Sequence, residues 1–150
     1  MAEGRALRLI AEDTADLDVL SPFVQDAVLK AENIKYDRAR RRFSLEINRF
    51  QWEDSTSNRG PQGRVRAILA FDGVLGVRAR AVTKADPDLV FSILSLSFEP
   101  ADEPPGGTIS ILFAGDGELA LEVEAIDATL LDSSYEWTTR HRPDHDKKRR

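Results

Sequence analysis

The chain has 150 residues, of which 41% are hydrophobic and 31% are charged, and its formal net charge is −5 at pH 7. This length and balance fit one soluble domain with a packed core. The absence of cysteine excludes disulfides, thiolate metal sites and cysteine nucleophiles. No apolar run approaches the roughly 20 residues of a membrane helix, and the polar start lacks a signal-peptide core, so we expect a cytoplasmic protein.

The charge is unevenly distributed along the chain. Residues 140–150 hold six of the 21 Lys and Arg and two of the 26 Asp and Glu, which leaves a formal charge of −9 on residues 1–139. We predict one domain over 1–139 and a disordered basic tail over 140–150. The tail also holds both histidines, His141 and His145, but Pro143 lies between them and no third ligand is fixed nearby, so no metal site is expected. An acidic body makes nucleic acid an unlikely partner.

The first elements in chain order are a strand and a helix. Residues 7–11 form a short apolar run typical of a strand, and Asp13 or Thr14 can cap the helix that follows. Apolar residues recur at helical spacing as far as Val28. Pro22 lacks a backbone donor, so the helix must either kink there or stop and restart with Ser21 as its cap.

The apolar period then changes to two. Residues 33–37 and 42–52 read as strands joined by a turn, with Phe43 among the inward residues. Phe50 and Trp52 fall on the opposite parity, so we expect a bulge near residues 48–49 that returns them to the inner face.

A polar loop over 53–63 precedes an apparent hairpin around Asp72–Gly73. A connection of three residues would pair Phe71 with Leu75 and keep the apolar faces together, whereas a two-residue turn would mix the faces.

The last strands are more apolar. Residues 89–98 read as a central strand, a loop rich in proline and glycine follows, and residues 108–113 and 118–131 flank a turn that would pair Phe113 with Leu119. A further bulge is expected near residues 124–125. The fold class is therefore α+β: about eight mainly antiparallel strands, in a curved sheet or partly closed barrel, with one N-terminal helix packed on it.

Four arginines form the first candidate site. In the expected hairpin, Arg66 faces Arg80 on the outer face, with Arg64 and Arg78 beside them, and like charges directly opposite destabilise a sheet. Ion pairs would relieve the repulsion if the acidic row of residues 118, 122 and 124 lies on the adjacent strand. The alternative is an external anion, because guanidinium groups bind carboxylate or phosphate with two hydrogen bonds.

The chain shows no catalytic motif, and no cofactor is expected. Our first hypothesis is a non-enzymatic binding or adaptor domain that contacts a protein or a small anionic ligand through the arginine face. A second is a small-molecule-binding protein or enzyme with a pocket between helix and sheet, lined by Gln25, Asp26, Arg49 and Trp52. A third is a homodimer that pairs exposed sheet edges; otherwise the chain is a monomer.

Several segments together resemble a known family. They include "RRFSLEINRFQWE", "FDGVLGVRARAV" and "GGTISILFAGDGELALEVEAIDATLLD". The combination is similar to small, mostly alphaproteobacterial proteins catalogued as domain of unknown function 2948, over about Leu7 to Trp137. The resemblance implies a single-domain cytoplasmic protein and supplies no activity, ligand or catalytic residue. Pro22 is unusual within the helix of that family.

Overall fold

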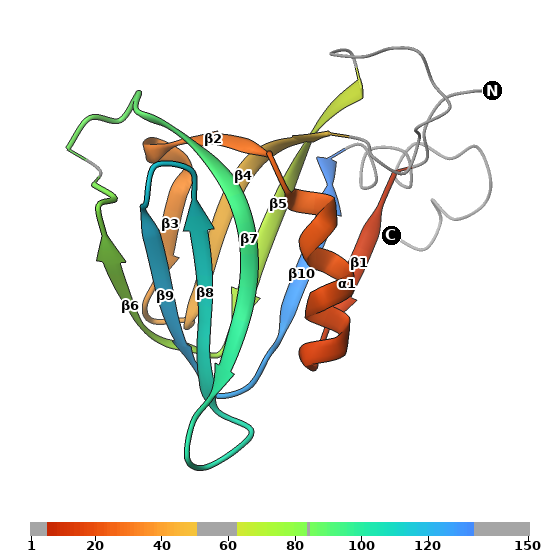
Figure 1. The fold of residues 1–150 in the computed structure, drawn as a ribbon, viewed down its shortest axis with the longest axis vertical. Coiled ribbons are helices and arrows are strands. Elements are labelled where there is room, and N and C mark those ends of the chain that lie inside the picture. Colours follow the sequence, from red (N-terminus) through yellow and green to blue (C-terminus); the bar gives the residue numbers. More distant parts are fainter. Residues whose placement is uncertain (1–5, 51–62, 84, 134–150) are drawn as a thin grey trace.

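The structure, a computed structural model, describes residues 6–50, 63–83 and 85–133 (Figure 1). The predicted tail and Trp52 lie outside the described residues. The elements in chain order are β1 (Arg8–Ala11), α1 (Thr14–Val24), β2 (Val28–Lys30), the 3-10 helix η1 (Ala31–Asn33), β3 (Ile34–Asp37), β4 (Arg42–Phe50), β5 (Arg64–Asp72), β6 (Val74–Arg80), β7 (Val90–Pro100), β8 (Gly107–Phe113), β9 (Glu118–Val123) and β10 (Ala128–Asp132).

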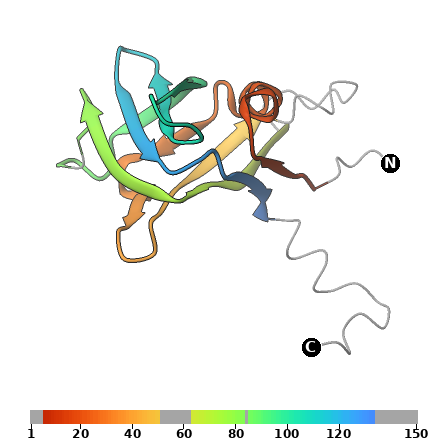
Figure 2. The same cartoon turned by 90° about the horizontal axis from the view of Figure 1, so that it is seen from below.

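Nine of the ten described strands form one antiparallel path with the order β1-β10-β5-β4-β2-β7-β8-β9-β6, and β3 pairs with β4 off this path. This confirms the predicted α+β fold with a curved, mainly antiparallel sheet and one α-helix. The path is open, but its end strand β6 is joined through Gly73 alone to β5, which is the third strand from the other end. The sheet therefore has to curl round on itself, as Figures 1 and 2 show.

The expected hairpin around Asp72–Gly73 is wrong. Strand β5 pairs with β4 and β10, whereas β6 pairs with β9. Gly73 has a φ of 73°, a conformation that glycine adopts without steric cost, and it bends the chain from one part of the sheet into another. The bend is held by Val74, whose backbone N–H donates to the carbonyl of Arg41 and whose own carbonyl accepts from the hydroxyl of Tyr36.

Helix α1 starts as predicted and passes through Pro22 without a break. The carboxylate of Asp13 accepts from the backbone N–H of Asp16 and caps the first turn. The hydroxyl of Ser21 does not cap a second helix, but accepts from the N–H of Leu96 in β7. The helix ends at Val24, so the helical assignment of Val28 is wrong: that residue begins β2. Within the described residues, no helix is long and apolar enough to cross a membrane.

Strand β4 pairs with β5 in an unbroken register from Arg42 to Phe50. The predicted bulge near residues 48–49 is therefore absent, and the inward parity of Phe43 continues to Arg49. Phe50 consequently lies on the outer face, where the guanidinium carbon of Arg64 is 4.6 Å from the centre of its ring.

Strands β8 and β9 form the predicted hairpin in a different register. Ile111 pairs with Leu119, and the N–H of Phe113 donates to the carbonyl of Gly117 in the turn. A shift of two residues leaves every side chain on its expected face, because side chains alternate with a period of two. The expected bulge near residues 124–125 is instead a break between β9 and β10, which pair with different neighbours.

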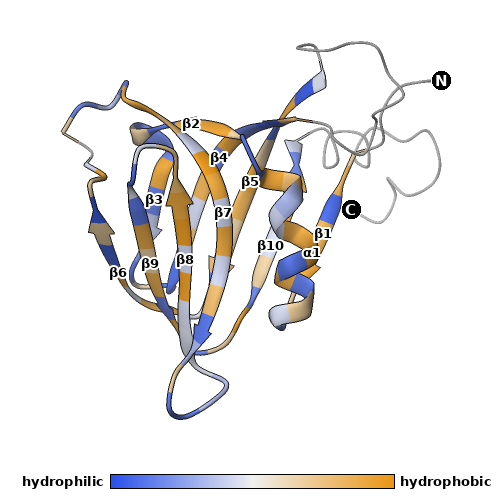
Figure 3. Ribbon diagram, viewed as in Figure 1, coloured by the Kyte–Doolittle hydropathy of each residue, from blue (hydrophilic) through white to orange (hydrophobic). Residues whose placement is uncertain are grey.

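The core fills the space that the curled sheet and α1 enclose, and the ribbon coloured by hydropathy shows alternation along its strands (Figure 3). Helix α1 contacts β7, β1 and β4 and contributes buried apolar residues from one stripe. The largest fully buried apolar side chains are Phe43, Phe71, Phe113, Leu17, Leu20, Leu45, Ile47, Leu69, Ile93, Ile109 and Ile111.

Candidate functional site

A cleft opens where β2 and β4 part. Val28 pairs with Asn48, and Ile34 pairs with Leu45. Five residues, 29–33, connect these two pairs on one side, but only two residues, 46–47, connect them along β4. The longer segment cannot stay paired with β4, so Leu29 and Lys30 pair only with β7, and η1 then carries the chain on to β3.

The cleft has a volume of about 310 Å³, at the small end of the range typical of ligand sites. It combines two cations, two carboxylates and two amides with an apolar wall. Its lining residues are Val28, Leu29, Lys30, Glu32, Asn33, Glu46, Ile47, Asn48, Arg66 and Val90.

The charged groups of the cleft are only loosely engaged with the protein. The closest approach of Arg66 to Glu46 is 3.9 Å between Nη1 and Oε1, and Lys30 Nζ lies 3.7 Å from Oδ1 of Asp88. All four of these side chains are substantially exposed. Exposed pairs at such distances contribute little stability, so a ligand can replace them at low cost.

Two amides complete the polar lining. The side chains of Asn33 and Asn48 make no hydrogen bond to any residue that the structure describes. Each amide can both donate and accept. The cleft can therefore offer a ligand hydrogen bonds of either kind, together with charges of either sign.

The four predicted arginines do not form one face. Arg66 and Arg80, expected opposite each other, lie on β5 and β6, which do not pair. Arg64 stacks on Phe50, and only Arg66 lines the cleft. Arg78 lies 3.5 Å from the carboxylate of Glu122.

Arg80 is engaged more tightly than Arg78. It donates to Glu118 Oε1 at 2.8 Å and to the carbonyl of Asp116 at 2.8 Å. The hydrogen bond from Arg80, followed by one from Ser110, lowers the pKa of Glu118 from its ordinary value. The predicted neutralisation of arginines by the acidic strand is thus observed for Arg78 and Arg80, with β9 as the adjacent strand.

Three of the four residues predicted to line a pocket between helix and sheet lie within the part of the chain that the structure describes. Gln25 and Asp26 are exposed residues that follow α1, and the N–H of Asp26 donates to the carbonyl of Ile93. Arg49 is 0% exposed and forms an ion pair, so it presents no charge to a ligand. Trp52 lies outside the described residues.

The partner of Arg49 is Asp132, which the sequence did not single out. Nε and Nη2 of Arg49 donate to the two carboxylate oxygens of Asp132, each at 2.9 Å. Asp132 Oδ2 also accepts from the backbone N–H of Leu7, and Nη1 of Arg49 donates to the carbonyl of Phe50. The pair joins β4 and β10 and fixes the chain that enters β1, which makes it a structural element.

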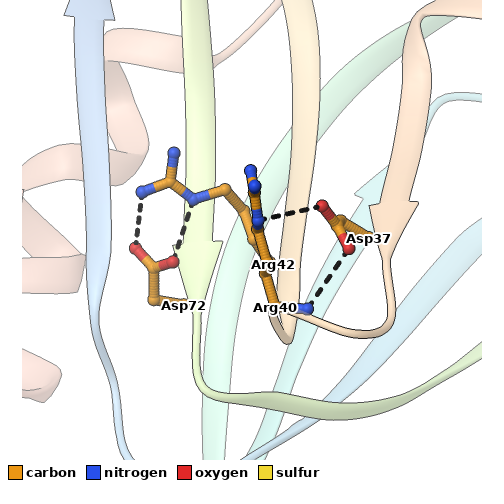
Figure 4. A network of polar contacts seen from close by, with 4 residues as sticks. All are labelled: Asp37, Arg40, Arg42 and Asp72. Carbon is orange, nitrogen blue, oxygen red and sulfur yellow. Dashed lines mark hydrogen bonds and ion pairs between the residues drawn. The ribbon is translucent and has the colours of Figure 1, made fainter.

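The arginines near the β3–β4 turn are also engaged within the protein. Arg42 forms a two-bond contact with Asp72, at 2.9 and 3.2 Å, and Asp37 accepts from the N–H of Arg40 at 3.2 Å (Figure 4). The hydrogen bond from Arg42 to Asp72 raises the pKa of this guanidinium above its usual range. Arg41 contacts Glu124. These contacts stabilise the β3–β4 turn and its neighbouring strands.

The elements described define a small α+β domain, built on a curled antiparallel sheet, with a ligand-sized cleft at its surface. The chain belongs to the family described as protein of unknown function DUF2948, whose sequence model matches residues 7–145. This confirms the family resemblance. No curated protein and no solved structure matches the chain.

Proposed function

We propose that this protein is a non-enzymatic binding domain whose cleft between β2 and β4 takes up a small zwitterionic ligand of about amino-acid size. The observation that carries the proposal is the composition of the cleft. Lys30 and Arg66 can contact a carboxylate, Glu32 and Glu46 can contact an amine, and the apolar wall can receive an aliphatic side chain. This proposal retains one of the four predicted arginines as a ligand-binding residue and relocates the pocket.

The chemistry favours a ligand with both charges over a simple anion. The two cations of the cleft face an equal number of carboxylates, so an anion alone would meet repulsion as well as attraction. A ligand carrying both groups satisfies both sets of side chains. Arg66 is the residue best suited to the carboxylate, because its guanidinium presents two parallel donors.

Matched probes can separate these contributions. L-leucine carries both charges, 4-methylpentanoate is the same molecule without the amine, and 3-methylbutylamine is the same molecule without the carboxylate. We expect L-leucine to raise the melting temperature of the protein and to bind in calorimetry, and each single-charge probe to bind at least about tenfold more weakly. Equal binding of all three probes, or no binding of L-leucine, would contradict the proposal.

The variant Arg66→Gln tests the location of the site. Its loss of one cation should weaken L-leucine binding by about tenfold, the effect of one charge-assisted hydrogen bond. Arg64→Gln is the matched control, because Arg64 lies on the same strand two residues away but stacks on Phe50 outside the cleft. Equal effects of the two substitutions would place the ligand elsewhere.

We further infer a cytoplasmic protein of bacterial, mainly alphaproteobacterial, occurrence. The support for the compartment is a chain without cysteine, which suits a reducing environment. The support for the source is the resemblance of the chain to the family described above. Cell fractionation with an antibody against the protein tests the compartment, and recovery in the membrane or periplasmic fraction would contradict it.

A further inference from the structure

The outer face of the sheet formed by β1, β10, β5 and β4 is more apolar than a solvated sheet face requires. Its central row places Arg8, Leu131, Ile68 and Glu46 side by side on the four strands. The next outward-facing row consists of Ile10, Thr129, Ala70 and Ser44, in which Ala70 is buried. Ile10 is 44% exposed and Ile68 is 38% exposed.

This face points away from the core. The residues between the outward positions, Leu130 on β10 and Leu69 on β5, are fully buried and pair with each other. Figure 2 shows that α1 lies against the inner side of β1 and β10, opposite this outer face. Apolar side chains rimmed by charged residues, on a face that no described element covers, are typical of an interaction surface.

The two ends of the central row carry opposite charges. Arg8 lies on β1 and makes no ion pair with any described residue. Glu46 lies on β4, three strands away, and is 3.9 Å from its nearest cation. At a strand spacing of about 4.8 Å, the backbones of the two residues are about 14 Å apart, so they cannot neutralise each other within one chain.

We propose that this face is the contact surface of a symmetric dimer of the chain. In face-to-face packing, the two-fold axis lies in the interface plane. An axis parallel to the strands and midway between β10 and β5 reverses the order of the row. Arg8 then faces Glu46 of the second copy, and Leu131 faces Ile68 of the second copy. This is the self-complementary pattern that a two-fold interface requires.

The charges exclude the other simple arrangement. An axis perpendicular to the strands would place Arg8 against Arg8 of the second copy and Glu46 against Glu46, and like charges directly opposite repel. With the first axis, both ends of the row form ion pairs between the two copies. Leu131 and Ile68 of each copy, four apolar side chains in all, meet in the middle. The proposal goes beyond ligand binding and differs from pairing of sheet edges.

The test is sedimentation equilibrium of the full chain over a range of concentrations. We expect a reversible dimer, because the apolar centre is small compared with that of obligate dimers. Ile68→Lys should weaken the dimer at least about tenfold, since it buries a charge against Leu131 of the second copy. Val19→Lys is the matched control, because Val19 is exposed on α1, away from this face, and its replacement should leave the dimer unchanged. A wild-type chain that stays monomeric into the millimolar range, or a dimer that survives Ile68→Lys, overturns the proposal.

A charge exchange tests the direction of the axis. Arg8→Glu should weaken the dimer about tenfold, because both ends of the row become repulsive. The double variant R8E/E46R restores opposite charges and should return the dissociation constant close to that of the wild type. Failure of the double variant to recover dimerisation overturns the axis and the residue pairing. Glu46 belongs both to the cleft and to this row, and Ile68 lies beside it. L-leucine binding is therefore measured on Arg8→Glu, whose substitution lies outside the cleft lining and three strands from Glu46. Loss of the dimer with L-leucine binding retained separates the two proposals.

Discussion

Arg49 and Asp132 are 83 positions apart in the sequence and meet as a fully buried, doubly hydrogen-bonded ion pair. Burying two charges costs several kcal/mol, which the contact repays only when the geometry is good and the remaining donors and acceptors are engaged. Both conditions hold here, because Leu7 donates to the carboxylate and the carbonyl of Phe50 accepts from the guanidinium. Removal of either partner leaves the other as an uncompensated charge.

Asp132→Leu should therefore destabilise the protein by about 3–5 kcal/mol, and Arg49→Met by a similar amount. The double variant R49M/D132L replaces the pair by apolar side chains, and its loss should be smaller than the sum of the two single losses. Urea denaturation of the four proteins closes this double-mutant cycle. Additive losses would show that the two residues contribute independently, contrary to the contact described.

The alternating pattern of the sequence indicates which face of the strand Arg49 occupies, but it does not indicate the role of this residue in the fold. Alternation from Phe43 onward puts residue 49 on the inner face, and only the opposite parity of Phe50 and Trp52 argued for a bulge there. The structure keeps the alternation and supplies a counter-ion from β10. A partner so remote in sequence cannot be inferred from local pattern, because no local feature of Asp132 distinguishes it from other acidic residues near a strand end.

The same limit explains the error at Gly73. Aspartate followed by glycine between two apolar runs is a strong hairpin signal. The sequence correctly locates a change of direction there, but the left-handed conformation of Gly73 serves equally to bend a strand. Whether β6 pairs with β5 or with β9 is decided by long-range packing. The cleft was missed for a related reason: Lys30 and Arg66 become neighbours only through the sheet order.

The pKa of Glu118 gives a prediction about pH. Its ordinary value is 4.5, and the hydrogen bond from Arg80 lowers it. A lowered folded-state pKa means that the contact stabilises the fold above the ordinary pKa and that this contribution is lost as the pH falls through the folded value. Arg80→Gln should raise the Glu118 pKa toward 4.5, whereas Arg78→Gln should change it less, because Arg78 acts on Glu118 by a weaker electrostatic attraction and not by a hydrogen bond. Carboxyl-carbon NMR titration measures both shifts, and an equal response to the two substitutions would contradict the assignment of the cause.

Gly107 is required by close packing at the start of β8. A Cβ atom there would lie 2.5 Å from the carbonyl oxygen of Glu99 and 2.5 Å from the ring of Phe98, and the carbonyl cannot move without disturbing the β7–β8 ladder. Gly107→Ala should therefore destabilise the protein by about 1–3 kcal/mol in urea denaturation. The control is Gly76→Ala in β6, where a Cβ meets nothing within 4 Å and the effect should stay within about 0.5 kcal/mol. Similar losses at both glycines would indicate a general cost of the substitution.

Pro22 offers a stabilising substitution. It lies inside α1, is exposed, and cannot donate the backbone hydrogen bond that its position in the helix provides for. Pro22→Ala restores that donor and removes the steric conflict with the preceding turn, so it should stabilise the protein by about 1–3 kcal/mol. Asp18→Ala, one turn earlier, improves helix propensity without restoring a backbone bond and should gain only about 0.5 kcal/mol. Thermal denaturation monitored by circular dichroism compares the two variants. A loss of stability in Pro22→Ala would mean that the rigid ring, through its restriction of the unfolded chain, stabilises the fold more than the missing bond weakens it.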